Sequence, residues 1–361
     1  MSAVDWWNQV RQWKLPIGWC FLFGLLLLAI FVFNNDALSW KRNKHHETHK
    51  DAAVGTGTEE WPLCVGDLLE NEDSHYEIES TRVFSSDRLN SKTPCRILQY
   101  KAEQVVACLD ELNDLTKKYP NRREELHFAF IGDSRTRQQF FNFVRLIPQY
   151  DKISSPSIVP ENYHNDVEVT SNLLNIRVSF KWRPLVSDDV TEEIRRWVHS
   201  ANETDRPYLI FLGMAVWHML QSEGADYQLY LKNLLNLAPV LDQLANDSQI
   251  IWLNQYPSVD FNKEIGVFKT DGIASEKIHR YNEVARRVFQ NHTKVRVWDS
   301  SNLFAEEYVR ACAVLERDEQ SSPLRRCPSV QFNCNDFLHT GDVALSQATQ
   351  LLVNDVCNEL A

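Results

Sequence analysis

The sequence is poor in glycine and has no excess of positive charge, and each deficit excludes a class of function. Only 11 of the 361 residues are glycine, and neither GxGxxG nor GxxxxGK[ST] occurs, so no nucleotide-binding loop is predicted. Lys and Arg number 38 against 49 Asp and Glu, which gives a formal charge of -11. Nucleic acid requires a basic face. We therefore expect no nucleic-acid partner and no bound cofactor.

Cysteine spacings typical of a metal site are also missing. The chain contains no CxxC and no ordered Cys/His ligand spacing, so we predict no metal centre. Disulfides in an oxidising compartment are the better interpretation. Cys20 lies in an apolar run, and seven cysteines remain, so at least one thiol stays unpaired within the monomer. We predict one short-range pair, Cys327 with Cys334. The seven are Cys64, Cys95, Cys108, Cys312, Cys327, Cys334 and Cys357.

One apolar run, Leu15 to Phe33, extends over 19 residues without a charge. At about 1.5 Å per residue it can span a bilayer core of about 30 Å. The alternative is a cleaved signal peptide ending near Ala37 to Ser39, but the apolar part of such peptides is about 7 to 15 residues long. We predict an uncleaved transmembrane helix. Basic residues on its two sides are nearly balanced, so charge does not fix its orientation.

Potential glycosylation sites indicate the orientation instead. Asn202, Asn246 and Asn291 each begin an N-x-[ST] sequence, which has meaning only if the large C-terminal part enters the secretory lumen. We therefore predict a single-pass type II protein. Residues 1–14 form the cytoplasmic tail, 15–33 the signal anchor, 34–60 a flexible stem that is polar and aperiodic, and 61–361 the lumenal domain.

Beyond the stem, short β-branched and aromatic runs alternate with segments of helical periodicity. This alternation predicts an α/β fold, with a mostly parallel sheet covered by helices on both faces. Chemistry in such folds lies beyond the carboxyl ends of the strands. The expected strands are His127–Ile131, Asn175–Trp182, Tyr208–Leu212, Gln249–Leu253 and Lys294–Trp298, and the expected helices are Arg135–Ile147, Tyr227–Ala245, Ala274–Gln290 and a final one, Asp342–Asn358.

A serine stands at one of these carboxyl ends. Gly132-Asp133-Ser134 follows the first expected strand and precedes a helix. A serine at such a turn exposes its hydroxyl, and its N-H lies near the helix N-terminus, where developing negative charge is stabilised. The alternative is that Asp133 or Ser134 only caps the helix. The motif alone is weak, but its strand-turn-helix setting favours a nucleophile.

A serine nucleophile needs a base, and His339 is the only histidine with an aspartate three residues before it, Asp336. On one turn, that carboxylate can accept the imidazole N-H while the other ring nitrogen faces the serine. The alternative is a surface turn that caps the last helix. His164, His199 and His218 are weaker candidates for the base.

These blocks resemble the SGNH hydrolases, with Ser134 in the first block and Asp336 and His339 in the last. The serine block continues as GDSxxRxQ in the similar plant polysaccharide O-acetyltransferases, and Arg137 and Gln139 match that extension. From Cys64 to Asn358 the chain also resembles the lumenal domain of the Golgi sialate O-acetyltransferase family. The resemblance implies a three-layer α/β/α domain, a Golgi location and a serine acyltransferase or esterase.

The chain departs from the SGNH pattern in the block that supplies an oxyanion donor. That family has an asparagine in a GxND block, whereas this chain reads Gly213-Met214-Ala215-Val216-Trp217. The oxyanion hole is then expected to use the N-H of Ser134, with Gly213, Arg137 and, more weakly, Asn254 in support. Loss of one such donor costs about 2.7 to 4 kcal/mol in enzymes built around it.

The combined prediction is O-acetyl transfer to a glycan hydroxyl through an acyl-serine, with sialic acid as the acceptor that the resemblance implies. The acceptor is a glycan or a nucleotide sugar, and acetyl-coenzyme A is the candidate donor. Because the sialate family carries a polytopic membrane domain after this region, a separate polytopic partner for the acyl donor is also expected. The alternatives are a carbohydrate O-acetylesterase and a lumenal binding protein with a vestigial triad.

Overall fold

The computed structural model divides the chain into two compact units, Met1–Glu60 and Trp61–Ala361. All residues that the structure describes belong to the second unit. They are 63–64, 67–69, 76–78, 95–118, 125–159, 163–200, 206–220, 227–257, 273, 275–290, 293–299, 302, 305, 339 and 342–358.

A seven-stranded sheet forms the middle layer of this unit, in the order β4-β5-β6-β3-β7-β8-β9. The strands from β6 to β9 are parallel, whereas β5 runs antiparallel to β6 and β4 antiparallel to β5. The strands are β3 (Leu126–Gly132), β4 (Ile153–Ser155), β5 (Val167–Ser171), β6 (Ile176–Trp182), β7 (Leu209–Gly213), β8 (Gln249–Leu253) and β9 (Arg296–Trp298). A separate parallel pair joins β1 (Tyr76–Ile78) and β2 (Cys95–Ile97).

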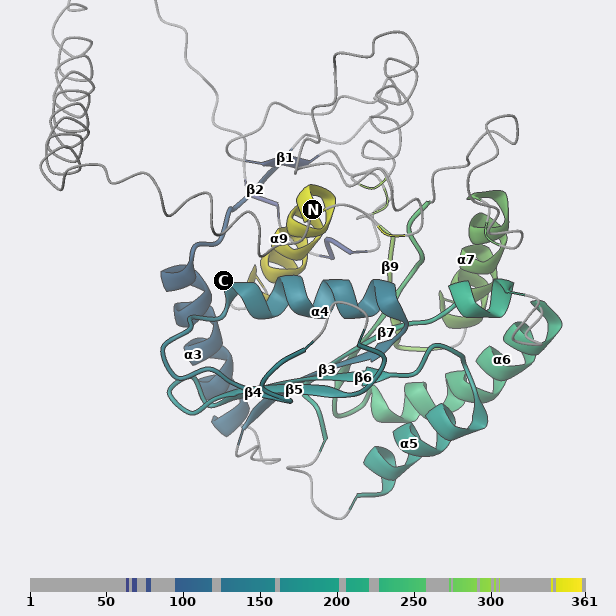
Figure 1. Cartoon of the computed structure of the whole chain (residues 1–361), viewed down its shortest axis with the longest axis horizontal. Helices are drawn as coiled ribbons and strands as arrows, with labels where there is room; N and C mark the ends of the chain where they lie inside the picture. The colour runs from purple at the N-terminus through teal and green to yellow at the C-terminus, as the bar shows by residue number, and fades with distance from the viewer. Residues whose placement is uncertain are drawn as a thin grey trace, which may run out of the picture. The chain divides into compact units, whose positions relative to one another are not determined.

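Helices cover both faces of the sheet (Figure 1). One core contains Phe128 and Phe130 of β3 and lies under α3, α4 and α9; the other contains Ala129 and Ile131 and lies under α5, α6 and α7. Every residue of β3 is buried, as expected for a strand with helices on both sides. The helices are α3 (Ala102–Lys118), α4 (Ser134–Leu146), α5 (Asp188–His199), the 3-10 helix η2 (Val216–Met219), α6 (Tyr227–Leu244), α7 (Ser275–Gln290) and α9 (Asp342–Asn358).

The predicted three-layer α/β/α fold is confirmed for the part of the chain that the structure describes. All five expected strands and all four expected helices are present, and the bounds of β8 and α9 agree with the prediction to the residue. The antiparallel extension β4-β5 was not predicted. Strand β4 has only three residues and its burial pattern is mostly exposed, so its sequence lacks a strand period.

Chain order places the end of β3 at a topological switch point. From β3 the chain forms β6 on one side, and it then crosses to β7 on the other. The loop after β3 leads to α4 on one face of the sheet, whereas the loops after β6 and β7 lead to α5 and α6 on the other face. In such folds ligands bind beyond the carboxyl ends of the strands at this point. Ser134 begins α4 at that point.

The last helix, α9, holds the early segments of the unit in place. Buried amide side chains of α9 bind the backbone after β2: Gln350 accepts from Tyr100 N-H at 2.7 Å, and Asn354 accepts from Leu98 N-H at 2.9 Å. A disulfide joins Cys357 of α9 to Cys108 of α3, 249 residues away in sequence. Disulfides that close long loops typically stabilise by about 2 to 4 kcal/mol.

Cys64 is disulfide-bonded as well, in line with the predicted oxidising compartment. The predicted pair Cys327 and Cys334 lies outside the described residues. So does the predicted span Leu15 to Phe33, and no helix among the described residues is long and apolar enough to cross a bilayer.

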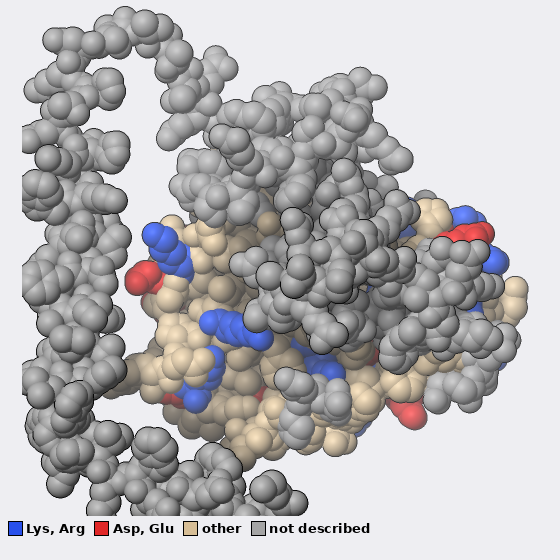
Figure 2. Space-filling view, turned by 45° about the horizontal axis from the view of Figure 1, so that its top comes forward, with Lys and Arg blue, Asp and Glu red and all other residues tan. Residues whose placement is uncertain are grey.

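On the face shown in Figure 2, lysine and arginine side chains are scattered over a mostly uncharged surface, with a few acidic side chains among them. Among the described arginines on strands and their ends, Arg177, Arg183 and Arg296 each pair with nearby carboxylates.

Candidate active site

The turn that carries Ser134 is built by a close approach of two glycines. Gly132 ends β3 beside Gly213, which ends β7. A Cβ on Gly132 would lie 2.0 Å from the Gly213 carbonyl oxygen and 2.5 Å from Thr136 Oγ1. The same carbonyl accepts from Asp133 N-H at 3.1 Å and from the Thr136 hydroxyl at 2.8 Å. Glycine is therefore required here because two strand ends and a hydroxyl share the space.

We expect Gly132→Ala to destabilise the domain and to displace Ser134. The added Cβ would meet a backbone carbonyl, which cannot move without disturbing the pairing of β3 with β7. Overpacking of this kind costs about 1 to 3 kcal/mol. Urea unfolding of the variant should show a lower midpoint than that of the unchanged chain. An unchanged midpoint would mean that the two strand ends are not in the contact described.

Asp133 caps the helix that Ser134 begins. Its carboxylate accepts from Arg135 N-H at 2.9 Å, and its side chain is fully buried. The second carboxylate oxygen is buried and has no hydrogen-bond partner among the described residues. Burial raises the pKa of Asp133, while the charges of Arg135 and His339 and backbone hydrogen bonds at the helix start oppose the rise. From the sequence, either Asp133 or Ser134 could cap the helix, and the structure shows that Asp133 does. The Ser134 hydroxyl is thus left for other chemistry.

The raised pKa predicts how Asp133 affects stability with pH. Because the folded chain binds this proton more tightly than the unfolded chain, the contribution of Asp133 to stability falls as pH rises from 3.8 through the folded pKa. The substitution Asp133→Asn replaces the carboxyl with an amide, which does not titrate. The unfolding free energy of the original chain, relative to the variant, should therefore decrease from about pH 4 upward. A urea-unfolding series that gave parallel pH profiles would contradict this.

His339 meets the serine as the sequence predicts. Its Nε2 lies 2.7 Å from Ser134 Oγ, although 205 residues separate the two in sequence. Ser134 is 9% exposed, so the residue is largely sheltered from solvent. When Nε2 is unprotonated, the hydroxyl donates to it, which is the arrangement that activates a serine. Asp336 lies outside the described residues, so the hydrogen bond from the His339 imidazole to its carboxylate stays a prediction.

The residues after Ser134 hold α4 against the elements that complete the site. Gln139 donates to the Thr349 hydroxyl of α9 at 2.8 Å and accepts from the Tyr256 hydroxyl at 3.1 Å. Arg135 donates to the Tyr256 carbonyl. Because α9 begins just after His339, this packing of α4 on α9 places the imidazole at the serine. The GDSxxRxQ extension therefore has a structural role in addition to its value as a motif.

The predicted oxyanion donors lie in different settings. Ser134 is the first residue of α4, so its N-H is one of those at the helix N-terminus that have no acceptor within the helix. Gly213 supports the turn through its carbonyl. The Arg137 guanidinium contacts the Tyr163 carbonyl and lies 5.8 Å from the Trp182 ring. The Asn254 amide donates to Asp299, which ties the end of β8 to the end of β9.

The other predicted residues have other neighbours or lie outside the described residues. His218 is buried and accepts from Val186 N-H at 2.8 Å, and His164 stacks on Trp182. Asn246 is exposed just after α6, which is compatible with a glycan. Asn202 and Asn291 lie outside the described residues. The sequence reasoning missed Thr136, because a threonine inside a helix gives no signal that its hydroxyl fills the gap between two glycines.

With this geometry in view, the chain can be compared with known proteins. No family model matches it. Over 281 residues it is 24% identical to N-acetylneuraminate (7)9-O-acetyltransferase from Danio rerio. The match covers 77% of this chain and 30% of that protein, so the chain spans less than a third of the relative's length. The predicted resemblance to the sialate O-acetyltransferases is confirmed.

Two solved structures show weaker similarity. A catalytic mutant of an acetylxylan esterase from Geobacillus stearothermophilus aligns over 65% of this chain and 95% of its own, at 15% identity and a TM-score of 0.35. A GDSL-like lipase from Parabacteroides merdae aligns over 66% and 98%, at 11% identity and a TM-score of 0.34. These TM-scores are below the level at which folds are taken to match. The sequence match and the contact between Ser134 and His339 are the two observations on which a function can be proposed.

Proposed function

We propose that this protein transfers acetyl groups to glycan hydroxyls through an acyl-serine at Ser134, with a sialic acid as the acceptor. The observation that carries the proposal is the 2.7 Å contact between Ser134 Oγ and His339 Nε2. It lies at the switch point of the sheet, where ligands of such folds bind. The similarity to an N-acetylneuraminate O-acetyltransferase supports both the reaction and the acceptor.

In the first step, Ser134 Oγ attacks the acetyl carbonyl of the donor while His339 Nε2 takes the hydroxyl proton. A C-O bond forms, and the carbonyl oxygen becomes an oxyanion. The Ser134 N-H, at the positive end of α4, is the donor best placed to stabilise it. Collapse of the oxyanion breaks the bond to the donor's leaving group, an alcohol or thiol, which receives the proton from His339.

In the second step, the acceptor hydroxyl attacks the acetyl-serine and gives its proton to His339. Collapse of the second oxyanion releases the O-acetylated glycan, and the proton returns to Ser134. Water in place of the sugar hydroxyl gives acetate and makes the protein an esterase. The partition depends on whether a sugar hydroxyl is held within near-attack distance while water is excluded.

One experiment separates these outcomes. The purified protein is incubated with acetyl-coenzyme A and sialic acid, with Ser134→Ala as the control. O-acetylated sugar above the control supports transfer. Efficient release of acetate from an O-acetylated glycan, without transfer, supports an esterase. If a folded protein gives neither product and a fluorophosphonate probe does not label it, the proposal is wrong.

We further propose that the domain is lumenal in a secretory-pathway membrane, most simply the Golgi. The exposed Asn246 and the disulfide between Cys108 and Cys357 support this. In cells, endoglycosidase should increase the gel mobility of the full-length chain, and changing Asn202, Asn246 and Asn291 together to Gln should remove that shift. An unmodified chain whose C-terminus is protected from lumenal labelling would contradict the topology.

A further inference from the structure

Three rings form an aromatic cluster at the end of β6: His164, Trp182 and Trp217. The His164 and Trp182 rings are stacked, with centroids 4.3 Å apart and planes 16° apart. Trp217 stands at 88° to both, with centroid distances of 5.9 Å to Trp182 and 6.4 Å to His164. All three side chains are partly or largely exposed. Partly exposed rings in contact with one another are more typical of a binding surface than of a core.

The cluster stands at the same sheet edge as the nucleophile. Trp182 ends β6 directly opposite Gly132, and Gly132 is also opposite Gly213, four residues before Trp217. Neighbouring strands lie about 4.8 Å apart, so the two tryptophans come from the strand ends on either side of β3. The cluster therefore lies at the same end of the sheet as Ser134.

Trp217 is the ring best suited to hold a ligand. It belongs to η2, in which Val216, His218 and Met219 are buried and only Trp217 is turned outward. The faces of Trp182 are already in use, because His164 stacks on the ring and Arg137 lies 5.8 Å from its centroid. Among the described residues, no ring stacks in parallel on Trp217. An outward indole with an unstacked face offers the flat apolar surface on which the C-H face of a sugar ring can pack.

Both tryptophans are firmly supported. Around Trp217, Tyr281 donates to the His218 carbonyl at 3.1 Å, and Lys277 donates to the Met219 carbonyl at 2.7 Å. This network fixes η2 on α7. A surface held in this way is pre-organised, so binding a ligand requires little ordering of the protein.

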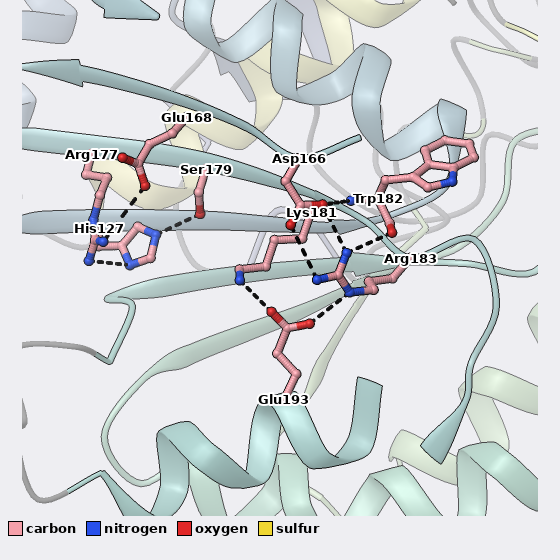
Figure 3. Close-up of polar contacts among 9 residues, drawn as sticks. All are labelled: His127, Asp166, Glu168, Arg177, Ser179, Lys181, Trp182, Arg183 and Glu193. Carbon is pink, nitrogen blue, oxygen red and sulfur yellow. Dashed lines mark hydrogen bonds and ion pairs between the residues drawn. The ribbon is translucent and has the colours of Figure 1, made fainter. Parts of the chain in front are cut away.

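Around Trp182, the backbone N-H donates to Asp166 at 2.9 Å, and Arg183 bridges Asp166 to Glu193 of α5 (Figure 3). Glu193 also accepts from Lys181, so one buried carboxylate holds the side chains on both sides of Trp182. Arg183 N-H in turn donates to the Gly132 carbonyl at 2.9 Å, which links this support to the serine turn.

We propose that the aromatic cluster is the acceptor subsite, in which a pyranose ring of the acceptor glycan stacks on Trp217 beside the acetyl-serine. This inference rests on the proposed function, because it states where the acceptor of that reaction binds.

The test compares Trp217→Ala with Trp217→Phe and with Trp197→Ala, a half-buried tryptophan of α5 as the matched control. The purified full chain is titrated with 3′-sialyllactose and with xylooligosaccharide, and binding is followed by ligand-observed NMR. We expect Trp217→Ala to weaken binding of at least one sugar by about 10-fold. Trp217→Phe and Trp197→Ala should bind nearly as the original chain does. Hydrolysis of p-nitrophenyl acetate by Trp197→Ala, which changes a residue outside the subsite, should stay within about twofold of that by the original chain.

Two results would overturn the subsite: binding of neither sugar by the original chain, or equal binding by Trp217→Ala. Fluorophosphonate labelling of Ser134 keeps this outcome separate from the proposed function. If Ser134 is labelled while Trp217→Ala binds sugar normally, only the subsite is wrong. If Ser134 is not labelled while sugar binding still depends on Trp217, the reaction is wrong and the subsite stands. If Trp217→Ala alone lost p-nitrophenyl acetate hydrolysis, Trp217 would be needed to hold the serine turn in place. That result would also overturn the subsite.

Discussion

Ser134→Ala should abolish acetyl transfer and fluorophosphonate labelling while the domain stays folded. The alanine removes the attacking oxygen but leaves the N-cap bond between Asp133 and Arg135 N-H, because that bond does not involve the serine hydroxyl. In a serine triad, loss of the nucleophile or of the base costs on the order of 10⁶ in kcat. His339→Ala should have a similar effect, and the double variant should be no worse, because the residues act as one unit.

The chain contains its own matched control for this experiment. Ser179 of β6 is also buried and also contacts a histidine, with 2.8 Å between Ser179 Oγ and His127 Nε2 (Figure 3). This second pair lies within the strands and not at a helix N-terminus, so no oxyanion donor is provided there. Ser179→Ala should retain both labelling and activity. Full activity in Ser134→Ala would contradict the assignment of Ser134 as the nucleophile. So would loss of labelling in Ser179→Ala but not in Ser134→Ala.

Asp336→Asn should lower kcat by about 10⁴ and leave the fold intact. An asparagine would hold the imidazole in the tautomer that presents a proton, and not a lone pair, to Ser134. The contact between His339 Nε2 and Ser134 Oγ requires the other tautomer for catalysis. The measurement is the kcat of acetyl release from an activated ester, with circular dichroism to show that the variant is folded.

Asp336→Asn combined with His339→Ala provides the control for that prediction. If the aspartate acts through the imidazole, the double variant should be as slow as His339→Ala alone. A kcat of Asp336→Asn within about tenfold of the original chain would show that a different group orients His339. Asp133 would then be the next candidate, because its charge already interacts with His339.

The sheet could be predicted because its buried strands are continuous runs of mostly apolar residues. Strand β3 is apolar on both faces, since Phe128 and Phe130 pack on one side and Ala129 and Ile131 on the other. Such continuous runs between helical periods predict a parallel, doubly covered sheet. The serine turn followed from the same reasoning, because the end of the first strand is where such folds place their chemistry.

Other features could not be read from the sequence, since they depend on contacts between distant segments. The pairing of Cys108 with Cys357 is set by how α3 and α9 pack, and spacing does not encode it. The surroundings of Trp182 and Trp217 are also set by distant segments. The structure leaves both partly exposed, because the rings meet only after the ends of β6 and β7 are placed on either side of β3. The exposure of these two tryptophans therefore depends on the order of the strands in the sheet.

The most direct test of the central claim is the capture of the acyl-serine. The purified protein is mixed with acetyl-coenzyme A or an activated acetyl ester, quenched in acid and digested, and the peptide containing Ser134 is examined by mass spectrometry. The account predicts one added acetyl group on Ser134, absent in Ser134→Ala and removed when an acceptor sugar is supplied before quenching. Turnover of the acetyl donor without any acetyl on Ser134, under conditions that trap acyl-serines in other enzymes, would contradict it.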